Sequence, residues 1–152
     1  MNIVRDLRIS RAIGKGNYSI AIDQYLIYLD KNPDDSYRRS MLALCYFWNN
    51  DPRKSIEEAK QVVKVEKHDF CMYTLMTKCY FKIEDHASGY QNACLAIANP
   101  PGPGLEIPKF ISWMPGVKNA VLQTARDDWN DLGWIRKYRK WCEDELGYQY
   151  NN

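Results

Sequence analysis

The feature that most constrains the fold of this chain is a repeat with a period of 34 residues. When the sequence is laid over itself at that offset, residues 44–47 (Leu-Cys-Tyr-Phe) align with residues 78–81 (Lys-Cys-Tyr-Phe), which gives three identities in four positions. The same offset aligns four further pairs of related residues: Leu42 with Met76, Ala59 with Ala93, Val62 with Ala96, and Asp51 with Asp85. The repeat extends over about three copies, and such arrays fold by stacking one supersecondary unit on the next until a continuous core is buried.

A set of mostly small and aromatic residues recurs in each copy. The set contains Gly16, Asn17, Tyr18, Ala21, Tyr25 and Pro33 in the first copy, Leu42, Ala43, Tyr46, Ser55, Ala59 and Val62 in the second, and Tyr73, Met76, Thr77, Tyr80, Gly89, Ala93, Ala96 and Pro101 in the third. Over residues 2–101 this pattern resembles the tetratricopeptide repeat family. The resemblance implies an all-α fold, a right-handed α-solenoid of helical hairpins, in which the first helix of each hairpin lines a concave groove that binds peptide segments.

Helix start and stop signals agree with this pattern independently of the family. Asp35 or Ser36, Asp51 and Asp69 each precede an apolar periodic segment, as helix N-caps do. The prolines at 100–101 stop the last helix of the repeat, because proline cannot donate a backbone hydrogen bond to the helix. The predicted helices span residues 3–14, 18–31, 36–49, 52–66, 70–83 and 86–98.

The chain departs from the family pattern at two places. Arg5 and Arg8 stand where the family has large apolar residues, which predicts a terminal helix with one solvated face. Where related cochaperones have a basic and asparagine-containing clamp for an acidic peptide, this chain has Met41, Cys71 and Leu75. We therefore do not expect it to bind acidic chaperone termini.

The C-terminal third begins with a connector and continues with helical patterns. Residues 99–108 are rich in proline and glycine and end the repeat. Two apolar stripes follow, one with Val117, Ala120, Val121, Thr124 and Ala125, the other with Trp134, Ile135, Tyr138, Trp141, Cys142 and Leu146. Because an open solenoid leaves its last apolar face bare, we predict that these stripes are C-terminal capping helices. The predicted organisation is three hairpins over 1–101, a connector over 102–116, and a capping helix or helices of the same domain over 117–147.

The inward-facing positions of the family's pattern form the predicted partner-binding groove. They are Tyr37, Ser40, Leu44, Phe47 and Trp48 in the second repeat, and Cys71, Thr74, Lys78, Phe81 and Lys82 in the third. Leu44, Phe47 and Trp48 together would form the kind of exposed apolar patch that marks an interaction site. The sequence is compatible with two different occupants of this groove. One is an amphipathic or apolar segment of a partner, whose acidic residues would meet the two lysines; the other is the chain's own segment with Phe110, Ile111, Trp113 and Met114.

A basic run in the last stripe supports an alternative function. Residues 134–141 interleave four large apolar residues with four basic ones, Arg136, Lys137, Arg139 and Lys140. Such a helix can lie on an anionic membrane or contact nucleic-acid phosphates. The electrostatic signal is weak, because acidic residues follow at 143–145 and the net charge of the whole chain is only +2.

No set of residues predicts catalysis, a cofactor or a metal site. The five cysteines form no CxxC pair, and only two histidines accompany them, so the spacing of zinc ligands is absent. Unpaired thiols are typical of a reducing compartment. The first residues lack the apolar core of a secretory signal, and no run approaches the roughly 18 apolar residues of a membrane span. We therefore expect a cytoplasmic protein without a transmembrane segment.

These features together predict a protein-protein interaction module that is not an enzyme. It would act as an adaptor, scaffold or partner-specific chaperone and bind a segment of another protein in its concave groove. The alternative is a docking protein that uses the basic aromatic helix on nucleic acid or anionic membrane. The identity of the partner and self-association are left open by the sequence.

Overall fold

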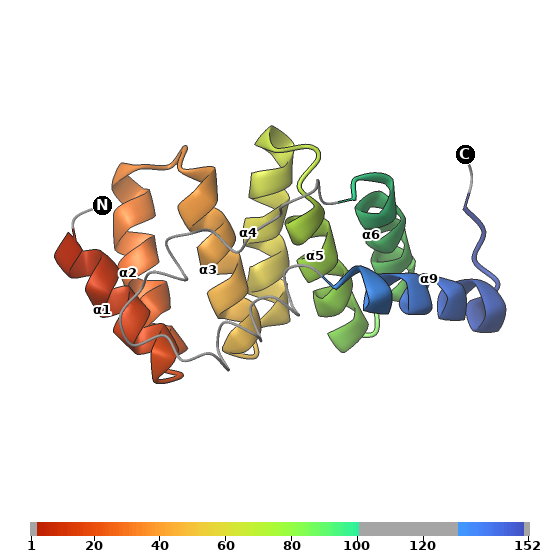
Figure 1. The fold of residues 1–152 in the computed structure, drawn as a ribbon, viewed down its shortest axis with the longest axis horizontal. Helices are drawn as coiled ribbons and strands as arrows, with labels where there is room; N and C mark the ends of the chain where they lie inside the picture. Colours follow the sequence, from red (N-terminus) through yellow and green to blue (C-terminus); the bar gives the residue numbers. More distant parts are fainter. Residues whose placement is uncertain (1–2, 101–130, 151–152) are drawn as a thin grey trace.

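The computed structural model describes residues 3–100 and 131–150, and these residues form helices and connecting turns without a strand. The helices are α1 (Ile3–Gly14), α2 (Tyr18–Lys31), α3 (Ser36–Trp48), α4 (Pro52–Val65), α5 (Phe70–Lys82), α6 (His86–Ala98) and α9 (Leu132–Leu146) (Figure 1). The predicted boundaries of the first six are confirmed to within one residue. The predicted stripe at 117–125 and the apolar segment at 110–114 lie outside the described residues.

Aspartates begin most of these helices. The side chains of Asp35, Asp51, Asp69, Asp85 and Asp131 each accept a hydrogen bond from the backbone N–H three residues later, at 3.0–3.2 Å. This bond satisfies one of the donors that the first turn of a helix leaves without a partner. The sequence predicted three of these caps. Helix α2 differs, because its N-cap residue Asn17 makes no capping bond with its side chain.

Small residues let consecutive helices approach one another at equivalent places in the three copies. Ala21, Ser55 and Gly89, which are separated by the repeat period, are all buried. The Ser55 hydroxyl donates a 2.7 Å hydrogen bond to the backbone carbonyl of Ala43 on the neighbouring helix. The small positions that the repeat pattern requires therefore lie at helix contacts, as predicted.

The helices stand side by side in a row, and their buried side chains form two apolar clusters (Figure 1). The first cluster joins α1, α2 and one side of α3 around Tyr25 and Leu42. The second and larger cluster joins the rest of α3 to α4, α5, α6 and α9 around Leu44, Leu75 and Ala93. Apolar residues on both sides of α3 make it the link between the two clusters.

Helix α9 covers α6 and runs across the direction of the stacked helices (Figure 1). Its buried stripe, Ile135, Tyr138 and Cys142, is at most 4 % exposed and belongs to the larger core cluster. Gly89 of α6 makes this packing possible, because a Cβ atom there would lie 2.4 Å from the Tyr138 hydroxyl oxygen. The predicted fold class is confirmed: the chain is an all-α solenoid of helical hairpins, with α9 as a capping helix.

Candidate partner-binding surface

The ten residues predicted to form the groove come from α3 and α5; Cys71 is buried, at 4 % exposure, and the other nine fall into three groups by exposure. Ser40, Leu44, Phe47 and Thr74 are at most 8 % exposed; Tyr37, Trp48 and Lys78 are partly exposed; Phe81 and Lys82 are exposed. We use the name α3–α5 face for the five residues of the second and third groups. The α3–α5 face is the part of the predicted groove with side-chain surface in contact with solvent.

The buried group belongs to the protein interior. Leu44, at 0 % exposure, and Phe47, at 8 %, are members of the larger core cluster, so they do not form the open patch that the sequence suggested. Ser40 donates its hydroxyl hydrogen bond to the Ser36 carbonyl at 2.9 Å. Thr74 is fully buried, and its hydroxyl has no hydrogen-bond partner in the described part of the chain. These four buried side chains lie beneath the exposed residues of the α3–α5 face.

The exposed group consists of two sequence neighbours at the end of α5, an aromatic residue and a lysine. Phe81 keeps 45 % of its surface exposed. The Lys82 ammonium lies 4.3 Å from the centre of the Phe47 ring, where the ring's electron density attracts a cation. Lys82 makes no ion pair with another residue of 3–100 or 131–150. Residues 81 and 82 thus offer an exposed apolar ring and a cation that has no ion-pair partner in the described part of the chain, which suits an amphipathic acidic segment.

Helix α9 contacts this surface through Asp131, Trp134 and Tyr138, of which the two aromatic residues were predicted as part of a capping stripe. Lys78 forms a 3.2 Å ion pair with Asp131, and its ammonium lies 5.7 Å from the Trp134 ring centre. Phe81 meets Trp134 edge-on at 5.6 Å and Tyr138 edge-on at 5.7 Å. The sequence shows these aromatic residues as a helical stripe, but no local pattern in it predicts that the stripe packs against α5.

These contacts are part of an aromatic cluster, which we define as Phe81, His86, Trp134, Tyr138 and Trp141. The rings of Trp134 and Tyr138 stack at 5.2 Å, and His86 meets Trp141 edge-on at 5.0 Å. The His86 Nδ1 atom and the Tyr138 hydroxyl oxygen are 3.0 Å apart. Burial raises the pKa of the Tyr138 hydroxyl well above its usual range. Tyr138 is therefore a neutral structural residue of the cluster.

The predicted alternative basic surface lies on α9 and is partly neutralised there. Arg139 bonds to Glu143 at 2.8 Å, and Lys140 bonds to Asp144 at 2.6 Å. Arg136 and Lys137 are exposed, and neither makes an ion pair with another described residue. Two of the four cations thus have a carboxylate one turn away, which weakens attraction toward phosphates.

The cysteines and histidines lie in structural settings. All five cysteines are buried as free thiols, and burial raises the pKa of the Cys45 thiol far above its usual value, so this sulfur stays protonated. His68 lies 2.7 Å from the Asn99 side-chain oxygen, a contact between two turns. No group of three histidine, cysteine or acidic side chains with the geometry of a metal site occurs among residues 3–100 and 131–150. None of the described helices is both long enough and apolar enough to cross a membrane.

Comparison with solved structures identifies the fold class as that of tetratricopeptide repeat domains. The chain is similar to the crystal structure of the Sgt2 TPR domain from Aspergillus fumigatus, with a TM-score of 0.61 and 16 % sequence identity. The alignment covers 99 % of this chain and 89 % of that one. No protein-family model and no curated protein matches the sequence. The likeness at this identity establishes a TPR-like helical repeat as the fold.

Proposed function

We propose that this protein is a partner-specific interaction module, an adaptor, scaffold or chaperone, that captures a segment of another protein on its α3–α5 face. It acts by binding rather than by catalysis. The TPR-like arrangement supports this function, because stacked hairpins create an extended surface from side chains of successive first helices. The five buried free thiols are compatible with a reducing, cytoplasmic setting.

The observation that carries the proposal is the exposed pair at the end of α5. Phe81 is 45 % exposed although it is a large aromatic residue, and Lys82 beside it has no carboxylate partner among the described residues. A folded chain gains free energy by covering such a ring, about 25 cal/mol for each Å² of apolar surface removed from water. A partner segment that carries an apolar residue for Phe81 and an acidic residue for Lys82 satisfies both requirements.

A matched pair of double variants tests this function. Phe81→Ala combined with Lys82→Glu alters the α3–α5 face. The control, Val65→Ala combined with Lys64→Glu, makes equivalent changes to an exposed apolar residue and its neighbouring lysine at the end of α4. Affinity purification from the native host, followed by mass spectrometry, compares the proteins retained by each variant. Circular dichroism checks that both variants keep the helical content of the wild type.

The expected result is the loss of one specific partner, or a small set, from the face variant and its retention by the control. Retention of every specific partner by a folded face variant would show that the proposal is wrong. In that case the segment at 110–114 becomes the leading candidate for the occupant. A partner lost from both wild type and control on raising the salt concentration would instead indicate the basic surface of α9.

A further inference from the structure

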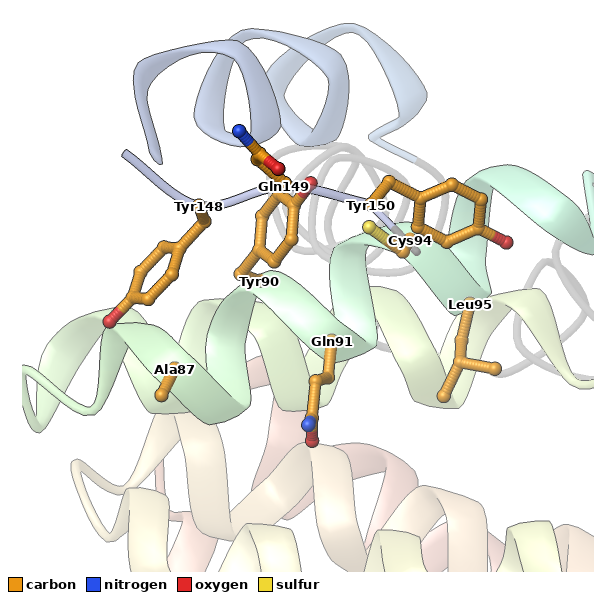
Figure 2. Close-up of a pocket in the computed structure, with 8 residues that line it drawn as sticks. All are labelled: Ala87, Tyr90, Gln91, Cys94, Leu95, Tyr148, Gln149 and Tyr150. Atoms are coloured by element: carbon orange, nitrogen blue, oxygen red, sulfur yellow. The ribbon is translucent and has the colours of Figure 1, made fainter. Parts of the chain in front are cut away.

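A pocket of about 510 Å³ lies where residues 147–150, the described C-terminal tail, pass over α6 (Figure 2). Its lining is uncharged and is dominated by aromatic and amide side chains: Tyr90, Gln91, Tyr148, Gln149 and Tyr150. The volume is within the range of about 300–1,000 Å³ that is typical of small-molecule sites. None of these residues belongs to the α3–α5 face, so this pocket is a separate site.

The tail is held in place by specific contacts. Gly147, with φ of 72°, ends α9 in the left-handed conformation and turns the chain back. The Tyr148 backbone N–H then donates a 3.3 Å hydrogen bond to the Cys142 carbonyl. The Tyr148 ring stacks on Tyr90 with 5.4 Å between ring centres, and the Tyr90 hydroxyl donates to Glu143 at 3.2 Å. The aromatic walls of the pocket are therefore fixed before any ligand arrives.

A second, basic pocket of about 340 Å³ adjoins the first. It is lined by Ile97, Arg136, Arg139, Lys140 and Glu143. The Arg139 guanidinium, which lines the second pocket, lies 5.1 Å from the ring centre of Tyr150, which lines the first, so this contact lies between the two pockets. Arg139 is engaged with Glu143, whereas Arg136 makes no ion pair within the described part of the chain. A neutral aromatic pocket thus lies next to a basic pocket that contains the available guanidinium of Arg136.

We propose that the two pockets together bind a small aromatic carboxylate. The planar ring of the ligand fits against Tyr148 and Tyr150, because aromatic rings gain from stacked or edge contacts. The carboxylate is bound by Arg136, whose guanidinium matches its two oxygens, with Lys140 at the rim. The uncharged first pocket has no cation to compensate a buried carboxylate, so the ring enters it and the charge stays in the basic pocket.

N-acetyl-L-tryptophan and its neutral analogue N-acetyl-L-tryptophanamide test the proposal on the full chain. The acid is titrated into ¹⁵N-labelled protein, and nuclear magnetic resonance follows the side-chain amides of Gln91 and Gln149 and the backbone amide of Tyr150. We expect saturable shifts at these three sites with the acid. The amide is expected to bind about tenfold more weakly, the loss typical of removing one charge-assisted hydrogen bond.

Two variants and a control separate the parts of the site. Arg136→Gln should weaken binding of the acid about tenfold and leave binding of the amide unchanged, whereas Tyr150→Ala should weaken both. Lys64→Gln, on α4, should change neither. The proposal is overturned if the acid causes no saturable shift at the three sites, or if Arg136→Gln binds the acid as tightly as the wild type does. Shifts confined to the α3–α5 face would overturn it as well.

Discussion

The two ends of the solenoid differ in how much of their apolar surface is covered. At the C-terminal end, α9 covers α6 with Ile135 and Tyr138, which are 0 % and 4 % exposed. At the N-terminal end, α2 leaves Ile20 and Ile27 at 43 % and 49 % exposure, and Val4 of α1 is 75 % exposed. Among residues 3–100 and 131–150, the stack therefore has one capped end and one open end.

The difference has an energetic consequence. The capping contacts join residues that are far apart in sequence, such as His86 and Tyr138, which are 52 residues apart. Ordering a distant helix against α6 costs loop-closure entropy, so its contacts must be strong enough to offset that cost. The open end relies on contacts within one hairpin and its neighbour. Substitutions at the capped end should therefore cost more stability than substitutions on the exposed side of α2.

The largest predicted effect compares Tyr138→Ala with Ile27→Ala. Tyr138 is 4 % exposed and contacts the other four rings of the aromatic cluster, so its truncation should lower the free energy of unfolding by about 3 to 5 kcal/mol. Ile27→Ala should change it by about 0.5 kcal/mol or less. Urea denaturation followed by circular dichroism measures both. Hydrogen exchange should also show faster exchange across α9 in Tyr138→Ala; equal losses for the two variants would refute the capped and open description.

The next prediction compares Gly89 of α6, which packs against α9, with Gly133, an exposed glycine of α9. In Gly89→Ala, the new methyl group would lie 2.4 Å from the Tyr138 hydroxyl oxygen and 3.2 Å from the ring carbon that bears it, so the Tyr138 ring or the helix that carries it must shift. We expect a loss of about 1 to 3 kcal/mol. Gly133 lies in the first turn of α9, and a methyl group added there would meet no described atom within 4 Å. Alanine at this position should add about 0.5 to 1 kcal/mol through helix propensity.

Thermal denaturation of the two alanine variants measures this comparison. A gain or no change in Gly89→Ala would show that the close approach of Tyr138 does not limit the packing of α9. A loss in Gly133→Ala would show that the first turn of α9 needs a glycine for a reason other than space.

Much of the fold was predictable because its signals are local. Helix starts depend on aspartates such as Asp51 and Asp69, and helix contacts depend on small residues such as Ser55 and Ala93; both kinds of signal recur with the repeat period. The cap of α9, Asp131, has the same chemistry but was missed because the repeat does not extend to it.

The candidate site was less predictable, because its character depends on contacts between distant segments. The family pattern placed Leu44 in the groove, yet this residue is fully buried in the larger core cluster. The contacts of Lys78 with Asp131 and Trp134 join α5 to a helix outside the repeat, and no periodic pattern encodes such a pairing. The tail pocket depends on the left-handed conformation of Gly147, which sequence alone suggests only as a helix end.

The smallest predicted effect concerns the helix caps at the two ends. Asp85 caps α6 near the capped end, and hydrogen bonds from the Ser88 hydroxyl and backbone N–H hold the pKa of its carboxyl below the usual value. Asn17 precedes α2 at the open end with nearly the same backbone angles, φ −85° and ψ 63° against −87° and 76°, but makes no capping bond with its side chain. Acid should therefore weaken the helix start at Asp85 and not the one at Asn17.

The direction of the pH effect follows from proton binding. The pKa of Asp85 is lower in the folded state than in the unfolded state, so the unfolded state binds more protons near the usual carboxyl pKa. The free energy of unfolding therefore falls as the pH is lowered through the folded-state pKa of Asp85. Asp85→Asn should make the free energy of unfolding less dependent on pH between about 5 and 2, and Asn17→Asp should make it more dependent, each by roughly 0.3 to 1 kcal/mol. Urea denaturation across that range measures both slopes. If Asp85→Asn follows the wild-type slope throughout, the charge on this cap does not contribute to the stability of the capped end.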